Sequence, residues 1–288
     1  MKKKSILWIL VLLLGLALVI TGCAKKEEGK KELPKEEPKQ EEKKEGDGSW
    51  ERVKKAGKIV AGLDDAYPPM GFRNDKGELV GFDIDMAKEI SKRIGVEIVW
   101  QPTEWSTVVA SLLSKKFDVI ISGMNMWPER QEVVNFAGPY GIAAQVILVK
   151  TENNDKIETL EDLKDKVIGT QLGSTGEKEC REAGFTDKNM KLYDKFPQAF
   201  IDLDNGRIEA VVIDGFTANE WIKTGKYKKV GKDVGADKGA TIGIAVRKED
   251  KELKAKLDEA IQSMLEDGTL TKISKKWTGY DITEGLRK

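Results

Sequence analysis

Histidine is absent from the 288-residue sequence, and only two cysteines occur. Without histidine the chain lacks the commonest general base and the commonest metal ligand, which excludes a histidine-dependent catalytic triad or zinc site. Once Cys23 is assigned to the leader described below, Cys180 has no partner for an intrachain disulfide, so we expect a half-buried structural thiol on a helix. The sequence therefore predicts no histidine-based zinc site and no catalytic cysteine.

The chain also lacks an excess of charge of either sign, because 49 lysines and arginines balance 49 aspartates and glutamates. A neutral chain creates no overall field that would attract nucleic acid. We therefore expect no nucleic-acid partner.

A hydrophobic run long enough to span a bilayer comfortably is missing as well. The apolar segment from Ile6 to Ile20 follows a basic start and is shorter than the roughly 20 residues that a span needs. The sequence ITGC then ends at Cys23 and resembles the lipobox of bacterial lipoproteins. The pattern predicts a signal peptide over residues 1–22, a lipid on Cys23 and an extracytoplasmic protein anchored to the cell membrane. The alternative is an uncleaved anchor with an incidental cysteine, and it also exports the rest of the chain.

A tether follows the leader. Residues 24–48 are almost all Lys, Glu, Pro and Gly, a composition that cannot bury enough apolar surface to offset its ordering entropy. We therefore interpret residues 23–49 as the lipidated cysteine and a flexible linker.

From residue 50 onward, short β-rich runs alternate with helical patterns, which predicts an α/β fold with mainly parallel sheets. One such helix is FDIDMAKEISKRI, for which Asp83 is the expected N-cap and Asp85 a second first-turn acid. Two series of these units follow one another. We therefore predict a first lobe over residues 50–142, a second lobe over 143–240, and a return to the first lobe over 241–288.

In the loop GMNMWPER, two residues occupy helix positions for which their side chains are unfavourable. Pro128 predicts the start of a helix, which leaves Trp127 at the cap position and Arg130 in the first turn. Tryptophan supplies no acceptor for the cap, and a cation is disfavoured near the positive end of a helix. A bound carboxylate would make Arg130 favourable there, since its planar fork suits a carboxylate bidentately. The alternative is an ordinary surface salt bridge.

Other candidate side chains follow predicted strands. Ser174 and Thr175 lie in QLGSTG before a helix, where an anion site or an ordinary capping turn would fit. Asp214 ends the run EAVVID and would either accept an ammonium or cap the next helix. Tyr67 and Trp105 are aromatic residues near carboxylates, suited to a flat or cationic group, or else to the core.

Together these loops resemble the periplasmic solute-binding proteins of polar amino-acid ABC transporters. The similarity runs from about Gly57 to Gly279 and includes AYPPMGFRNDKGELVGFDIDMAKEI, PERQEVVNFAGPY, DLKDKVIGTQLGST and NGRIEAVVID. The resemblance implies a two-lobed type II (Venus-flytrap) fold with two hinge strands that closes on an amino acid. It also implies a monomer that delivers the ligand to a membrane permease, catalyses no reaction and needs no cofactor or metal ion.

The resemblance implies roles for individual residues. At the carboxylate end, Arg130 corresponds to the arginine that holds the ligand α-carboxylate. Gly123 and Asn125 correspond to residues that contact the ligand, and Ser174 and Thr175 to the hydroxyl loop of the second lobe.

At the other end, the resemblance implies that Asp214 takes the α-ammonium and that Tyr67 and Trp105 bracket the side chain. Asp64 corresponds to an acid that reads the distal polar group. Trp127 departs from the pattern, because the family usually has threonine there, and losing that cap costs about 1 kcal/mol. Our hypothesis is that Trp127 narrows or stacks on the side-chain pocket.

The identity of the ligand stays open at this stage. Asp64, Asp65 and Glu104 favour a basic amino acid such as arginine or lysine, while glutamine, histidine or cystine remain alternatives. A dehydratase that acts on cyclic carboxylic acids would have no use for Asp214 as an ammonium acceptor. A sensor domain would need a second transmembrane span or a kinase segment, and neither follows.

The lipobox interpretation predicts the fate of a Cys23→Ser variant. Because the thiol would carry the lipid, the variant is expected to leave the membrane fraction or to accumulate as an unprocessed precursor. Cell fractionation and the mass of the mature protein measure this. A variant that matures and fractionates like the wild type would refute the lipobox.

Overall fold

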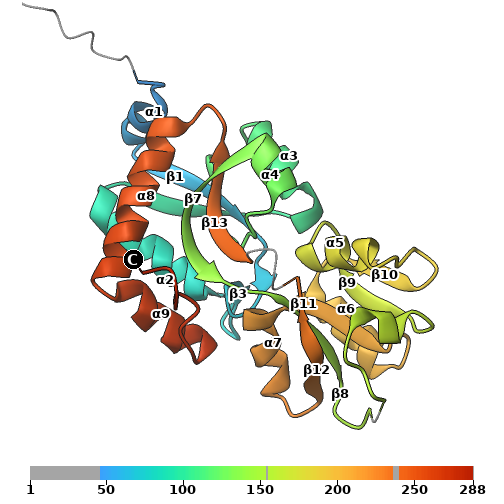
Figure 1. The fold of residues 1–288 in the computed structure, drawn as a ribbon. Helices are drawn as coiled ribbons and strands as arrows, with labels where there is room; N and C mark the ends of the chain where they lie inside the picture. The colour runs from blue at the N-terminus through green and yellow to red at the C-terminus, as the bar shows by residue number, and fades with distance from the viewer. Residues whose placement is uncertain (1–45, 154, 236–239, 288) are drawn as a thin grey trace, which may run out of the picture. The chain divides into compact units, whose positions relative to one another are not determined.

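The structure is a computed structural model that describes residues 46–153, 155–235 and 240–287 (Figure 1). The predicted signal peptide, Cys23 and nearly all of the tether lie outside the described residues. Within the described ranges, no helix has the length and apolar character needed to cross a membrane.

The first sheet has the strand order β5-β1-β6-β13-β7. Its first three strands are parallel, whereas β13 runs antiparallel to both β6 and β7. Because β13 is antiparallel to both of its neighbours, β7 runs in the same direction as β5, β1 and β6, and the prediction of a mainly parallel sheet is confirmed for this half. The strands are β1 (Lys58–Leu63), β5 (Glu97–Pro102), β6 (Val119–Ile120), β7 (Val134–Ile142) and β13 (Thr241–Arg247).

Helices from both ends of the described chain pack on this sheet, and a small sheet of the order β2-β3-β4 lies beside it. The helices are α1 (Ser49–Ala56), α2 (Phe82–Ile94), η1 (Trp105–Thr107), α3 (Val108–Leu113), α4 (Pro128–Val133), α8 (Lys251–Glu266) and α9 (Thr269–Thr278). The short strands are β2 (Ala66–Tyr67), β3 (Gly71–Arg73) and β4 (Leu79–Val80). We call these elements, with the first sheet, the first lobe.

The second sheet has the order β10-β9-β11-β8-β12 and is also mixed, because β8 runs antiparallel to β11 and β12. Its strands are β8 (Gln145–Lys150), β9 (Ile168–Gln171), β10 (Met190–Tyr193), β11 (Ala210–Asp214) and β12 (Tyr227–Val234). Its helices are η2 (Leu160–Leu163), α5 (Thr175–Glu182), α6 (Phe196–Asp204) and α7 (Gly215–Ile222). We call this half the second lobe.

The chain passes between the two sheets twice. It leaves the first sheet after Ile142 at the end of β7 and enters the second at Gln145. It leaves the second sheet after Val234 and re-enters the first at Thr241, which is paired with Ile142. Val234 and Gln145 are paired in turn, so the described ends of the two crossings lie side by side. The predicted two-lobed type II fold with two hinge strands is confirmed, although the sheets are mixed.

The start of α2 differs from the prediction. Gly81, and not Asp83, is its N-cap residue, and its φ of 139° is a conformation that glycine tolerates best. A Cβ on Gly81 would lie 2.2 Å from the carbonyl oxygen of Met70, so the close approach also requires glycine. Asp83 is instead a fully buried residue of the first turn.

Cys180 is fully buried in α5, where we had expected a half-buried structural thiol. Burial raises the pKa of this thiol to about 12. Since the thiolate is the reactive form, Cys180 is inert near neutral pH.

A buried ion-pair network joins the helices at the two ends of the described chain. Arg247 and Asp250 are both about 2% exposed, and their closest nitrogen and oxygen lie 2.6 Å apart. Arg52 of α1 donates to both oxygens of Asp250, at 3.1 and 3.2 Å. Arg247 also donates to the carbonyl oxygens of Leu112 and Phe117. Asp250 thus compensates a buried guanidinium and ties α1 to the start of α8.

An Asp250→Ala variant is expected to lose about 3 kcal/mol of unfolding free energy, because it leaves the buried Arg247 charge without its main partner. Urea denaturation followed by circular dichroism measures the loss. Glu249→Ala is the matched control, since the neighbouring carboxylate is largely exposed and lies 4.0 Å from Arg247. Equal stability of the two variants would show that the buried pair does not stabilise the fold.

Candidate functional site

Polar loops of both lobes enclose a cavity. The cavity volume is about 10 Å³, roughly the room that one water molecule needs. The lining residues are Asp64, Tyr67, Trp105, Ser122, Gly123 and Asn125 from the first lobe and Gln171, Ser174, Thr175 and Asp214 from the second. Eight of the ten predicted site residues are therefore brought together here. Trp127 and Arg130 instead line a neighbouring surface groove, together with Gly173, Ser174 and Thr175.

Asp214 is a buried acid of the cavity. It stands at the N-cap position of α7, but its side chain makes no capping hydrogen bond. Its carboxylate instead accepts hydrogen bonds from Asn125 Nδ2 at 2.9 Å, from Gln145 Nε2 at 2.5 Å and from the hydroxyl of Tyr67. Burial raises its pKa, and these donors only partly offset that effect. The simple capping alternative does not describe Asp214.

Arg130 is a cation that contacts only neutral partners. It donates to the carbonyl oxygens of Asn125 at 3.1 Å and Gly173 at 3.0 Å, and its guanidinium lies 5.4 Å from the Trp105 ring centre. No carboxylate of the described residues lies within ion-pair distance of it, so the surface-salt-bridge alternative does not apply. Burial lowers the pKa of Arg130 to about 10, which keeps it charged at neutral pH. The helix α4 has only six residues, so its dipole contributes little.

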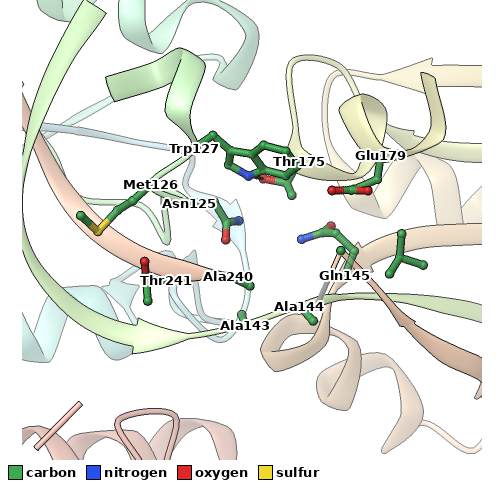
Figure 2. Close-up of a pocket in the computed structure, with 12 residues that line it drawn as sticks. Asn125, Met126, Trp127, Ala143, Ala144, Gln145, Thr175, Glu179, Ala240 and Thr241 are labelled. Atoms are coloured by element: carbon green, nitrogen blue, oxygen red, sulfur yellow. Dashed lines mark hydrogen bonds between the residues drawn. The ribbon is translucent and has the colours of Figure 1, made fainter. Parts of the chain in front are cut away.

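The two hydroxyls of the QLGSTG loop have different partners. Ser174 caps α5, since its oxygen accepts the Glu177 N–H at 3.1 Å. Thr175 accepts the indole N–H of Trp127 across the lobes, also at 3.1 Å. Figure 2 shows the Trp127 ring against Thr175, with the amides of Asn125 and Gln145 pointing toward one another below it. Trp127 therefore contacts the second lobe, and it does not line the cavity with Asp64.

The three acids that favoured a basic ligand, Asp64, Asp65 and Glu104, have different surroundings. Asp64 lines the cavity and accepts hydrogen bonds from Gln171 Nε2 at 2.7 Å and from the Ala66 N–H at 2.9 Å. Burial raises its pKa. Asp65 is already ion-paired with Arg73 at 2.8 Å and with Lys195 at 3.4 Å.

Glu104 lies 3.9 Å from Lys195 and is largely exposed, so the charge of Lys195 also offsets this acid. Of the three acids that favoured a basic ligand, only Asp64 faces the cavity.

Sequence reasoning missed four residues of this region: Ser122, Gln145, Gln171 and Lys195. Ser122 and Gln171 follow or end predicted strands, as Asp214 does, so the same rule could have identified them. Gln145 begins β8, and no local pattern shows that its amide reaches Asp214. Lys195 precedes α6, and its proximity to Asp65 and Glu104 arises only from the tertiary fold.

A buried carboxyl lies beneath the Gly123 loop. Gly123 has a φ of 56°, and its N–H donates to the hydroxyl oxygen of Tyr140 at 3.1 Å. Asp83 lies beside both groups and is fully buried. Burial raises the pKa of Asp83 to about 7, and the Tyr140 hydroxyl and the Gly123 amide offset this only in part. Asp83 thus lies next to the Gly123 loop, which lines the cavity.

The fold and the cavity define a two-lobed binding protein with its candidate site between the lobes. Residues 59–280 match the model of the bacterial extracellular solute-binding proteins, family 3. The chain therefore belongs to this family.

Two curated relatives come from Escherichia coli strain K12. The L-cystine-binding protein TcyJ is 35% identical over 83% of this chain and 89% of its own length. The ABC transporter arginine-binding protein 1 is 38% identical over 77% of this chain and 91% of its own length. The solved structure of an ABC uptake transporter substrate-binding protein from Streptococcus pneumoniae with bound histidine is 32% identical. It has a TM-score of 0.75 and covers 82% of this chain and 98% of that one.

The raised pKa of Asp83 predicts a pH dependence of stability. Folded Asp83 has a pKa of about 7 and keeps its proton up to that pH, whereas the unfolded carboxyl loses its proton near pH 3.8. Its stabilising contribution is therefore complete below that lower value and is lost as the pH rises to about 7. The slope is at most about 1.4 kcal/mol per pH unit. An Asp83→Asn variant should lose this slope in urea denaturation between pH 5 and 8.

Asp85→Asn is the matched control, because Asp85 lies two residues away in the same helix. Burial tends to raise the pKa of Asp85, but hydrogen bonds from Lys276, Trp277 and Lys88 outweigh this and lower it. The control should keep the slope that Asp83 produces. If Asp83→Asn retains the slope of the wild type, Asp83 is not the titrating group.

Proposed function

We propose that this protein binds a basic amino acid outside the cytoplasm and delivers it to the permease of an ABC transporter, without catalysing a reaction. The family, and relatives named for binding cystine and arginine, support this proposal. Residues 50–142 and 241–288 would close against residues 143–240. The lipid on Cys23 would hold the protein, as a monomer, near its permease.

The observation that carries the proposal is a half-buried cation and a buried anion, neither of which has an ion-pair partner among the described residues. Arg130 on the first lobe contacts neutral carbonyl oxygens, and Asp214 on the second accepts from neutral donors. Each pKa shift records the cost of burial, downward for Arg130 and upward for Asp214. An amino-acid zwitterion supplies a carboxylate for the first and an ammonium for the second. Charge-assisted hydrogen bonds would then replace weaker neutral ones.

The same arrangement gives a reason for closure. A ligand can favour the closed state only by making contacts there that the open state lacks. Because Arg130 and Asp214 belong to different lobes, a zwitterion contacts both only when the lobes meet. The contacts of Asn125 and Tyr67 with Asp214 also cross between the lobes, so the unliganded protein partly satisfies Asp214 by itself.

Asp64 supports a ligand with a cationic end. Unlike Asp65 and Glu104, it lines the cavity, together with Tyr67 and Trp105. Its neutral partner Gln171 leaves its charge uncompensated by direct ion pairing among the described residues. Arginine or lysine fits this chemistry best. Cystine, glutamine and histidine are the competing ligands, since each is a zwitterion with a polar side chain.

A dehydratase on the same fold is the rival function. Such chemistry needs an acid placed to protonate a leaving hydroxyl. Among the described residues that line the cavity, the carboxyl groups are those of Asp64 and Asp214. Asp214 is held by three donors in a position suited to an ammonium, and Asp64 is fixed by two. This arrangement favours binding.

We call Arg130 and Asp214 together the zwitterion clamp. The clamp predicts the behaviour of two variants in calorimetric titrations with L-arginine, L-lysine, L-histidine, L-glutamine and L-cystine. Arg130→Ala should lose about 2–5 kcal/mol of binding free energy, because the ligand carboxylate loses a charge-assisted contact. Asp214→Asn should weaken amino acids more than their deaminated analogues. The wild type should bind at least one of the five, with the basic ligands preferred.

Arg181→Ala is the matched control for Arg130. Arg181 lines the same surface groove but already pairs with Asp187 and Glu177 at 2.6 and 3.4 Å. Its loss should leave affinity nearly unchanged. If Arg130→Ala and Arg181→Ala bind alike, the clamp assignment is wrong. If no amino acid binds the wild type, the proposed function is wrong.

A further inference from the structure

The hydrogen bond between Trp127 and Thr175 commits the hydroxyl oxygen to an acceptor role. Trp127 lies at the cap position of α4 in the first lobe, and Thr175 is the first residue of α5 in the second. An indole N–H can only donate, whereas a hydroxyl has one proton and two acceptor sites. The Trp127 N–H therefore occupies an acceptor site of Thr175 Oγ1 and leaves the proton to point elsewhere.

The neighbouring hydroxyl of Ser174 has no proton to spare. Thr170 Oγ1 donates to the carbonyl oxygen of Val212 at 2.9 Å, and a carbonyl oxygen can only accept. The 3.2 Å contact between Thr170 and Ser174 must therefore use the Ser174 proton. Since Ser174 Oγ also accepts the Glu177 N–H, its hydroxyl is fully engaged in holding the loop and capping α5.

Thr175 lines the same cavity as Ser174 but differs from it in the hydroxyl proton. Its hydroxyl proton has no acceptor among the residues that the structure describes, and its side chain lines the cavity between the lobes. The residue is 7% exposed, so bulk water does not readily supply an acceptor. A buried hydroxyl with an uncommitted proton is suited to an anionic acceptor.

We infer that Trp127 is a positioning residue that directs the Thr175 hydroxyl proton at the ligand carboxylate, and that Ser174 serves the fold alone. This inference rests on the proposed function and deepens it. The indole and the hydroxyl come from different lobes, so the oriented donor exists only in the closed state. Recognition of the carboxylate is thereby coupled to closure.

The inference also accounts for the tryptophan at the cap of α4. A threonine there would cap its own helix, whereas the longer indole reaches the opposite lobe (Figure 2). Lys178 contacts the ring as well, with its Nζ 4.4 Å from the ring centre. Glu129 fixes this lysine through an ion pair at 3.1 Å. Trp127 thus acts at the carboxylate end of the site, away from Asp64, which changes our initial hypothesis about the side-chain pocket.

A double-mutant cycle tests the inference, with L-arginine as the titrant in calorimetry. Trp127→Phe keeps the ring but removes the N–H, and should weaken binding about threefold to tenfold because the hydroxyl proton loses its direction. Thr175→Val removes the hydroxyl and should weaken binding about tenfold or more. In the Thr175→Val background, Trp127→Phe should cause no further loss, because the donor it orients is gone.

Thr175→Ser is the control that keeps the hydroxyl, and in this background Trp127→Phe should again weaken binding. Additive losses in the cycle would show that Trp127 acts only as a closure contact, and they would overturn the inference. So would unchanged affinity in Trp127→Phe. Both results leave the proposed function standing, whereas a wild type that binds no amino acid removes both. Melting temperatures of the unliganded variants confirm that each one folds.

Discussion

The charge of Asp214 is the constraint on which the candidate site depends. A carboxylate so deeply buried is costly unless hydrogen-bond donors surround it, and here they come from three separate parts of the chain. Tyr67 and Asn125 reach it from the first lobe, and Gln145 reaches it from the second. Because two of the three donors belong to the opposite lobe, the solvation of one charge depends on whether the lobes are closed.

Gln145 connects this charge to the hinge. It is the first residue of β8, directly after the crossing from Ile142. Because Gln145 and Asp214 both belong to the second lobe, the hydrogen bond between them does not depend on whether the lobes are closed. In an open state Asp214 would keep Gln145, lose Tyr67 and Asn125, and gain water. The closed state must therefore replace water by donors of comparable strength. A ligand ammonium is a stronger donor than either neutral side chain, which is why a zwitterion would shift the balance toward closure.

The parts that sequence reasoning predicted well are those with a local cause. Pro128 set the start of α4, and strand ends located Asp64 and Asp214. The errors lie where distant segments meet. The approach of Gly81 to the Met70 carbonyl oxygen displaces the cap from Asp83. Arg130 was identified through a helix dipole that a six-residue helix hardly has. Its burial among neutral partners is the better reason.

Counting acids in the sequence also overstated the case for a cationic ligand. Asp65 and Glu104 are close to Lys195, and Asp65 is paired with Arg73 as well, so their fields at the cavity are largely cancelled. Specificity is a difference in affinity between competing ligands, and only uncompensated charge contributes to it. The preference for a basic side chain therefore depends on Asp64, which faces the cavity and whose charge Lys195 offsets only in part. Because Gln171 of the second lobe donates to that carboxylate, even this preference is set where the two lobes meet.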